Sequence, residues 1–217
     1  MINIIEYDVF GMAYAIEGMR NPMNSWDKSD SNFIWEDRTY LLGKNDETLA
    51  KRLINAGEDH RKFMRMIHVQ ATVNAPLYWW KEFDTYKVGT VANSCSTMHT
   101  IHKREFTLDD FSHEHLTTRS EICLMNTIKD LNFYRQRFID LKDKKYWWQM
   151  IQLLPSSYNQ MRTIDLNYEV LFKMYQARKN HKLDEWREFC EWIEYLPSMD
   201  KFLRLEIEIP EEGSNGI

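Results

Sequence analysis

Residues 64–87, MRMIHVQATVNAPLYWWKEFDTYK, join two segments with different hydrophobic periods. Apolar side chains alternate over 64–74 and place Ile67, Val69, Ala71 and Val73 on one side of a predicted strand. The other side carries Met66, His68, Gln70 and Thr72, which is polar enough to line a pocket or face water. Pro76 suits the first turn of a helix, so we predict a helix over 77–87 that Gly89 breaks.

The segments before this stretch predict one more strand and one more helix. Residues 2–10 are β-branched and aromatic and predict a first strand. Residues 20–45 are polar, with isolated Trp26 and Trp35, and predict a long loop of a kind that is often functional. Residues 46–57 predict a helix with Asp46 as its N-cap and Gly57 as its C-terminal stop.

The segments after it are mostly helical. A Ser/Thr/Cys-rich stretch at 90–100 precedes them, and Pro155 stops the second helix. The predicted elements are helices at 117–142 and 145–154, a strand at 158–167, helices at 168–179 and 183–195, and a terminal strand at 203–209. We therefore predict one α+β domain over residues 1–209, followed by a disordered polar tail at 210–217.

Composition excludes several classes of protein. The 217 residues are 43% hydrophobic and 28% charged, which suffices for a buried core. A net charge of −5 gives no general attraction to nucleic acid or to anionic membranes. Three dispersed cysteines predict reduced thiols in a cytoplasmic protein, and neither a secretory signal nor an 18-residue apolar window is found. Gly-rich phosphate loops, nucleophile elbows and CxxC pairs are also missing from the sequence.

Two clusters of chemically active residue types have competing interpretations. His99 and His102, and likewise His113 and His115, lack the third and fourth ligands that a metal site needs, so we predict no metal site. The aromatic run Tyr78-Trp79-Trp80 with Phe83 and Tyr86 points around most of a helix. Core packing is one interpretation, and a subunit interface or a ring-stacking surface is the other.

The order of these segments resembles the flavin-dependent thymidylate synthases, the ThyX family. Ala75-Pro76-Leu77-Tyr78 stands where that family has an Ala-Pro-aliphatic-aromatic entry to a helix. The family's Arg-His-Arg signature falls on Thr85-Tyr86-Lys87 or, shifted by one, on Tyr86-Lys87-Val88. The shifted register places Ser96 on the family serine and Asn93 on the asparagine before it.

The second half of the chain resembles the family more closely. Leu154-Pro155, Asn167 and Arg178 keep the family's spacings without a gap, and His181 and Trp186 follow. The resemblance covers about residues 40–195. It implies a single ThyX-like domain in which long helices pack on a central antiparallel sheet.

The resemblance also implies ligands, partners and site residues. A member of this family is a homotetramer that binds FAD and dUMP, with methylenetetrahydrofolate as co-substrate when it is catalytic. The nucleotide-binding positions carried over are Arg178, Asn167, His181, Ser96 and Asn93, and the cofactor-binding positions are Tyr86, Lys87 and His99. No catalytic residue is assigned.

The departures from the family pattern concern its cationic side chains. The Arg-His-Arg triplet is absent, and Lys87 alone keeps a positive charge there. Met98 falls on an arginine that binds nucleotide phosphate, and Glu169 stands where arginine is common. A charge-assisted contact contributes about 1.5–3 kcal/mol to binding, so two losses weaken phosphate binding by at least a hundred-fold.

Other residues of the chain are candidates to replace the lost flavin and phosphate contacts. The family histidine that contacts flavin falls near Arg65 or Met66, and Lys103, Arg104 and Arg162 are candidate replacements for the lost phosphate contacts.

Our hypothesis is a diverged ThyX-like protein that binds a uracil or other pyrimidine nucleotide, with methyl transfer to dUMP altered or lost. The alternatives are a different reaction on a modified pyrimidine, and a non-catalytic binding or structural protein on a ThyX-like homo-oligomeric scaffold.

Overall fold

The computed structural model describes residues 1–34, 36 and 39–205 and divides them into two compact units. Unit 1 comprises Met1–Asp8, Gln70–Asp165 and Asn180–Phe189. Unit 2 comprises the described parts of Val9–Val69, Leu166–Lys179 and Cys190–Ile217. Four of the five boundaries between the units fall inside a strand or a helix, and the fifth follows α7 (Tyr168–Arg178). The prediction of one domain over 1–209 stays a prediction.

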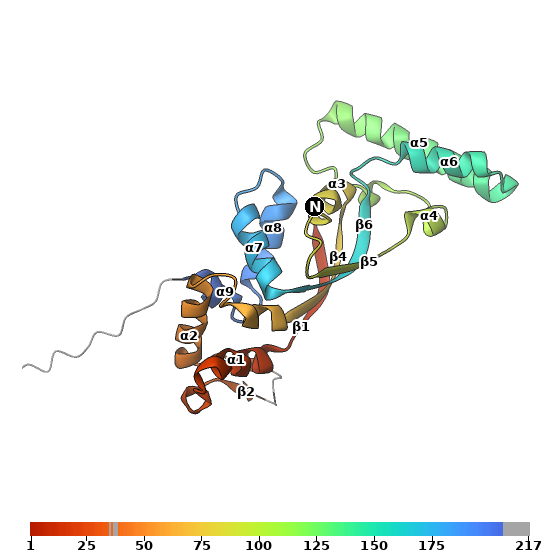
Figure 1. Cartoon of the computed structure of the whole chain (residues 1–217). Coiled ribbons are helices and arrows are strands. Elements are labelled where there is room, and N and C mark those ends of the chain that lie inside the picture. Colours follow the sequence, from red (N-terminus) through yellow and green to blue (C-terminus); the bar gives the residue numbers. More distant parts are fainter. Residues whose placement is uncertain (35, 37–38, 206–217) are drawn as a thin grey trace, which may run out of the picture. The chain divides into compact units, whose positions relative to one another are not determined.

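A four-stranded antiparallel sheet carries most of unit 1 (Figure 1). Its order is β1 (Asn3–Phe10), β4 (His68–Pro76), β6 (Asn159–Asn167) and β5 (Thr90–Ser94). The predicted strands at 2–10, 64–74 and 158–167 are confirmed apart from their ends, because residues 62–66 form the 3-10 helix η3 (Lys62–Met66). Strand β5 was not predicted, since its sequence TVANS lacks a hydrophobic alternation.

Strand β4 shows the predicted alternation. Val69, Ala71, Val73 and Ala75 are at most 2% exposed, whereas His68 and Gln70 on the other side are exposed. The polar side is bonded to the next strand: Gln70 Nε2 donates to Asp165 at 2.9 Å, and the hydroxyls of Thr72 and Thr163 lie 3.2 Å apart. This strand therefore separates a dry face of the sheet from a wet one.

Helix α3 (Leu77–Phe83) begins directly after β4, with Pro76 as its N-cap, and ends four residues earlier than predicted. Trp79 and Trp80 are fully buried, and Trp79 contacts Trp186 at 4.9 Å and Phe189 at 5.3 Å between ring centroids. The last two belong to α8 (Asp184–Glu194). Core packing is therefore the correct interpretation for most of the aromatic run.

Helices α5 (Thr118–Leu141) and α6 (Lys144–Leu153) form an antiparallel hairpin, drawn in green in Figure 1. Both predicted helices are confirmed, and Lys142 makes the left-handed turn between them. They share a core with the segments α4 (Thr97–Thr100) and η4 (Leu108–Asp110). Its buried members are Ile101, Phe106, Phe111, Leu124, Ile128, Leu131 and Met150.

Unit 2 is largely helical. Its elements are α1 (Met12–Arg20), η1 (Asn21–Met23), η2 (Trp26–Lys28), β2 (Asn32–Ile34), β3 (Thr39–Leu41), α2 (Lys44–Asn55), η3, α7 (Tyr168–Arg178) and α9 (Met199–Leu203). The predicted loop over 20–45 is wrong, because it contains two 3-10 turns and the hairpin β2–β3, in which Phe33 pairs with Tyr40. Trp35 lies outside the described residues.

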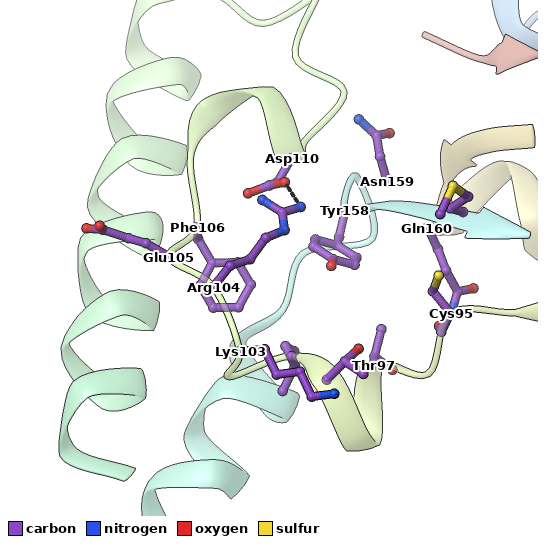
Figure 2. Close-up of a pocket in the computed structure, with 13 residues that line it drawn as sticks. Cys95, Thr97, Lys103, Arg104, Glu105, Phe106, Asp110, Tyr158, Asn159 and Gln160 are labelled. Atoms are coloured by element: carbon purple, nitrogen blue, oxygen red, sulfur yellow. Dashed lines mark hydrogen bonds and ion pairs between the residues drawn. The ribbon is translucent and has the colours of Figure 1, made fainter. Parts of the chain in front are cut away.

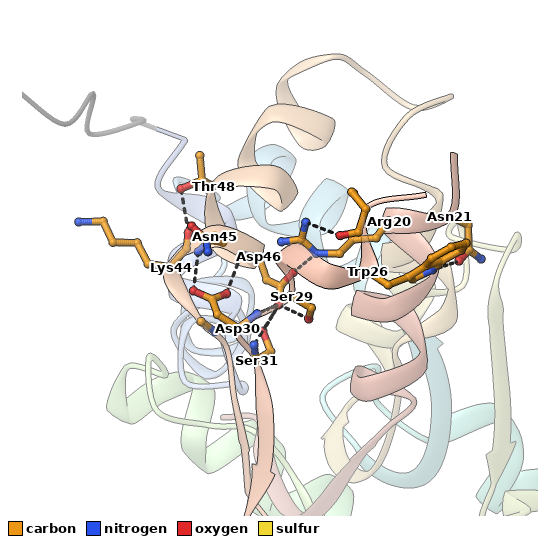
Figure 3. Close-up of polar contacts among 12 residues, drawn as sticks. Arg20, Asn21, Trp26, Ser29, Asp30, Ser31, Lys44, Asn45, Asp46 and Thr48 are labelled. Carbon is orange, nitrogen blue, oxygen red and sulfur yellow. Dashed lines mark hydrogen bonds and ion pairs between the residues drawn. The ribbon is translucent and has the colours of Figure 1, made fainter. Parts of the chain in front are cut away.

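Asp46 organises this segment, but not as the N-cap that we predicted. Gly43 is the N-cap of α2, and Asp46 is fully buried in the first turn. Its carboxylate accepts hydrogen bonds from Arg20 Nε at 2.5 Å, Ser29 Oγ at 2.8 Å and Ser31 Oγ at 2.6 Å (Figure 3). Burial raises the pKa of Asp46, but these hydrogen bonds outweigh burial and bring the pKa below its ordinary value.

The described residues include only the first part of the predicted C-terminal strand at 203–209. Leu203 ends helix α9, and Arg204 and Leu205 have no regular structure, so the predicted strand does not begin at 203. Its remainder at 206–209 and the predicted tail at 210–217 lie outside the described residues. Within the described ranges, no helix has the length and apolarity needed to cross a membrane.

Replacing Asp46 by Ala is expected to lower the free energy of unfolding by about 3–5 kcal/mol, because it leaves the Arg20 guanidinium buried without its counter-charge. In the native chain, this stabilisation is complete above the unfolded aspartate pKa of about 3.9 and is lost as pH falls through the lower folded pKa. Urea titrations at several pH values measure both effects.

The matched control is Glu121→Ala, which removes an exposed carboxylate from helix α5. This control is expected to change the free energy of unfolding by less than about 0.5 kcal/mol. Equal destabilisation by the two variants would contradict the central role of Asp46.

Candidate functional site

A cavity of about 280 Å³ opens in unit 1 beside helix α4 (Figure 2). Its walls come from the β5–α4 turn, the segment after α4 and the first residues of β6. We call it the unit 1 cavity and define it by Cys95, Thr97, Lys103, Arg104, Tyr158 and Gln160. Its volume lies just below the range of about 300–1,000 Å³ that is typical of small-molecule sites.

Two cations lie in the wall of the unit 1 cavity, and they differ in availability. Arg104 Nη2 is hydrogen-bonded to Asp110, a buried carboxylate that also accepts from the Thr107 backbone N–H at 2.8 Å. Lys103 is exposed, and its ammonium has no ion-pair partner in the part of the chain that the structure describes. Lys103 is therefore the cation best placed to meet an anionic ligand.

The opposite wall is apolar and amide-bearing (Figure 2). Tyr158 packs edge-on against Phe106 at 6.3 Å and Phe111 at 5.7 Å. Burial raises the pKa of Tyr158, against the opposing effect of Arg104, so its phenol stays neutral. Gln160 Nε2 donates to the Cys95 carbonyl at 2.7 Å, which ties the two walls together.

Three predicted site residues lie on the segment that borders the unit 1 cavity. Ser96 is the N-cap of α4, and its Oγ accepts from the His99 backbone N–H at 3.3 Å. Asn93 lies exposed on β5, and His99 lies exposed on α4. Ser96 keeps its hydroxyl proton for a ligand, because the cap uses only its oxygen.

Three further predicted residues lie away from this cavity lining, near Trp186. The rings of Tyr86 and His181 lie 6.1 Å and 6.3 Å from the Trp186 ring. His181 Nδ1 accepts a hydrogen bond from the Leu183 backbone N–H at 3.2 Å. The neutral imidazole therefore carries its proton on Nε2. This Nε2 atom lies 3.5 Å from Glu82 Oε2. Lys87 is exposed beside Tyr86.

The two remaining predicted residues belong to unit 2. Asn167 is the N-cap of α7, and its side-chain oxygen accepts from the Val170 backbone N–H at 3.1 Å, which is a structural role. Arg178 lies half-buried in the last turn of α7. Burial raises the pKa of the Cys190 thiol to about 12, and the positive charge of Arg178 partly opposes this shift.

Glu169, which stands where the family commonly has arginine, is the centre of a charge cluster in unit 2. This carboxylate is 3% exposed and bonded to Arg65, with Arg61 at 3.4 Å and Lys173 at 3.5 Å. Burial raises the pKa of Glu169, but the three cations lower it by more than burial raises it. The pKa of Glu169 therefore lies below its ordinary value. The charge on Arg65, one of the cations near an expected flavin contact, is thus largely neutralised within the chain.

Lys103, Arg104 and Arg162 are the three candidates to replace the lost phosphate contacts, and Arg162 is already bonded to other side chains. Its Nη1 donates to Asp84 at 2.7 Å, its Nε donates to Gln160 at 3.0 Å, and its guanidinium lies 4.4 Å from the Trp80 ring centroid. This arginine stabilises the β6 surface and leaves Lys103 as the available cation.

Sequence reasoning missed Cys95, Tyr158 and Gln160 in the unit 1 cavity. Cys95 and Tyr158 are far apart in the sequence, and they meet because the Cys95 backbone N–H donates to the Met161 carbonyl at 2.9 Å. No sequence motif signals this pairing. Within residues 1–34, 36 and 39–205, no three His, Cys, Asp or Glu side chains converge into a metal-binding group.

Comparison with solved structures reveals the fold. The chain is similar to thymidylate synthase X (ThyX) from Helicobacter pylori with FAD and dUMP, at TM-score 0.64 and 15% identity, covering 93% of this chain and 95% of that one. It is also similar to the UMP/dUMP methylase PolB from Streptomyces cacaoi bound with 5-Br UMP, at TM-score 0.63 and 11% identity, covering 94% of each chain.

Neither a family model nor a curated protein sequence matches the chain. The structural similarity confirms the predicted ThyX-like fold and its class, an antiparallel sheet with long helices. At these identities the similarity concerns the fold alone.

Proposed function

We propose that this chain is a ThyX-like nucleotide-binding protein that takes a pyrimidine nucleotide such as dUMP, with methyl transfer altered or lost. The observation that carries the proposal is the unit 1 cavity, where the available Lys103 ammonium lies in a wall bordered by Ser96. A nucleotide phosphate needs such a cation and hydroxyl donor, and an apolar wall suits its base. Related folds were crystallised with dUMP or 5-Br UMP.

Altered catalysis follows from the side chains at the signature positions. Thr85-Tyr86-Lys87 supplies one cation where the family has two arginines, and the Tyr86 ring is packed on Trp186. An electrostatically stabilised reaction loses rate when fixed positive charge is removed from the site. We propose that binding is retained, because Lys103 and Ser96 still offer a cation and a hydroxyl at the unit 1 cavity.

FAD is proposed as the cofactor, with Lys87 and Tyr86 as the residues that would hold it. The exposed Lys87 ammonium fits a pyrophosphate oxygen, and the half-buried Tyr86 ring offers a stacking face. A reduced flavin supplies hydride, and methylenetetrahydrofolate would be needed only if methyl transfer is retained. We also propose a cytoplasmic location, as the dispersed cysteines indicate, and a homotetramer, as the resemblance implies.

A non-catalytic oligomeric scaffold is the second candidate function. Unit 1 exposes large apolar side chains on three of its strands: Ile5 at 53%, Val91 at 69% and Met161 at 41%. Exposed apolar side chains on sheet strands favour association between copies of a chain.

Replacing Lys103 by Ala is expected to weaken dUMP binding by about 10- to 100-fold, because it removes one charge-assisted contact to phosphate. Isothermal titration calorimetry of the purified protein measures the change. Lys129→Ala, which removes an exposed lysine of helix α5, is the matched control and is expected to leave the affinity within twofold. Unchanged dUMP affinity in Lys103→Ala would remove the unit 1 cavity as the phosphate site.

Replacing Arg178 by Ala tests the nucleotide contact that was carried over from the family pattern. We expect at least a tenfold loss of dUMP affinity, and Arg178→Lys is expected to recover part of it because the charge is retained. Thermal unfolding of both variants controls for helix stability. If dUMP binds equally to native protein and Arg178→Ala, this assignment is wrong.

Visible absorption of concentrated protein, before and after incubation with FAD and removal of the excess, tests the cofactor proposal. Retained flavin absorbance is expected, and Lys87→Ala is expected to reduce it. A colourless protein that binds dUMP would reject FAD and keep nucleotide binding. A protein that retains neither ligand but elutes as a tetramer in light-scattering chromatography would favour the scaffold.

A further inference from the structure

We propose that unit 2 contains a second binding site, which takes a neutral, flat heterocycle with a hydrogen-bond acceptor beside an N–H donor. The site is a cavity of about 370 Å³, which we call the unit 2 cavity. Its polar and aromatic wall consists of Glu17, Arg20, Trp26, Ser29, Ser31 and Tyr40. These residues share no member with the unit 1 cavity, so this inference goes beyond the proposed function.

Arg20 provides the donor that points to a ligand. It is 3% exposed and lines the cavity; its Nε is bonded to Asp46 and its Nη1 to the Ser25 carbonyl at 3.2 Å. Its Nη2 is buried and has no hydrogen-bond partner within the described residues. A buried donor without a partner is costly, and an acceptor atom on a bound ring would satisfy it.

The charged residues at the unit 2 cavity disfavour an anionic ligand. Asp46 already neutralises the Arg20 guanidinium at 2.5 Å, and Glu17 adds an exposed carboxylate to the same cavity. Arg20, Asp46 and Glu17 together carry a net charge of −1, so a phosphate or carboxylate group is repelled. Glu17 accepts hydrogen bonds and suits an N–H group next to the ring's acceptor.

Aromatic side chains in the lining offer faces on which a flat ring can stack. Trp26 is 49% exposed, and its ring is held by a hydrogen bond from Nε1 to Asn21 Oδ1 at 2.8 Å (Figure 3). Tyr40 and Phe33 lie in the same wall and also line an adjoining cavity of about 290 Å³ with Met12 and Tyr14. The adjoining cavity has room for a substituent on the ring.

Lactam edges, as in uracil, and amidine edges, as in adenine, both carry this acceptor–donor pair. Photocrosslinking with 5-iodouridine, followed by peptide mass spectrometry of the full-length protein, locates the bound ring. We expect adducts within residues 13–40, the sequence range that holds the cavity wall. Competition by excess uridine or adenosine distinguishes the two edges, and inorganic phosphate is expected not to compete.

Glu17→Ala is the test variant, because Glu17 is exposed and its loss leaves the buried pair of Arg20 with Asp46 intact. We expect at least a tenfold loss of crosslinking in 13–40, with dUMP affinity unchanged. Glu121→Ala, the matched carboxylate removal on α5, is expected to have no effect.

Three results would overturn this proposal. They are an absence of adducts in 13–40, adducts there that survive excess uridine and adenosine, and displacement of the adducts by phosphate. Failure of dUMP to bind would bear on the proposed function alone, because the crosslinks are mapped by residue.

Discussion

Strand β4 imposes the constraint on which the rest of unit 1 depends: one of its faces must be dry and the other wet. Val69, Ala71, Val73 and Ala75 are buried, while Gln70 and Thr72 are bonded to polar partners on β6. A register slip of one residue would exchange the two faces, so the pairing of β4 with β1 and β6 is strongly specified. The strand runs through Pro76 into α3 and brings Trp79 and Trp80 into the core.

Several arginines of this chain are committed to intramolecular ion pairs. Arg20 pairs with Asp46, Arg65 with Glu169, Arg104 with Asp110, and Arg162 with Asp84. A cation that is already paired gains less from a phosphate, because the ligand must compete with a carboxylate. The unit 1 cavity differs from these sites in having Lys103, and this difference is the physical basis of the proposed nucleotide site.

The two cavities therefore suit different chemistry. The unit 1 cavity has an available ammonium, an apolar wall and a helix cap at its border, which together favour a phosphorylated ligand. The unit 2 cavity has a neutralised guanidinium, a carboxylate and aromatic rings, which favour an uncharged ring. In both, the charge balance of the wall discriminates among ligands more sharply than the volume does.

Hydrophobic periodicity determined the strands β4 and β6 and the helices α5, α6, α7 and α8, whereas β-branched and aromatic composition determined strand β1, which buries none of its residues. The order of those segments was enough to indicate the ThyX-like fold at 16% identity or less to thymidylate synthase X and PolB. Tertiary structure decided the roles of the polar residues. Asp46 looked like a helix cap and is a buried counter-ion, and Asn167, which we predicted as a nucleotide contact, also caps helix α7.

Tertiary structure also decided which cations are available and where the cavities lie. Cys95 and Gln160 meet only through a strand pairing, and Arg20 meets Asp46 only through the packing of α1 with α2. Hydrophobic patterns are local in sequence, and a single segment displays them. Ion pairs and cavity walls join residues that are distant along the chain, so they exist only once the chain has folded.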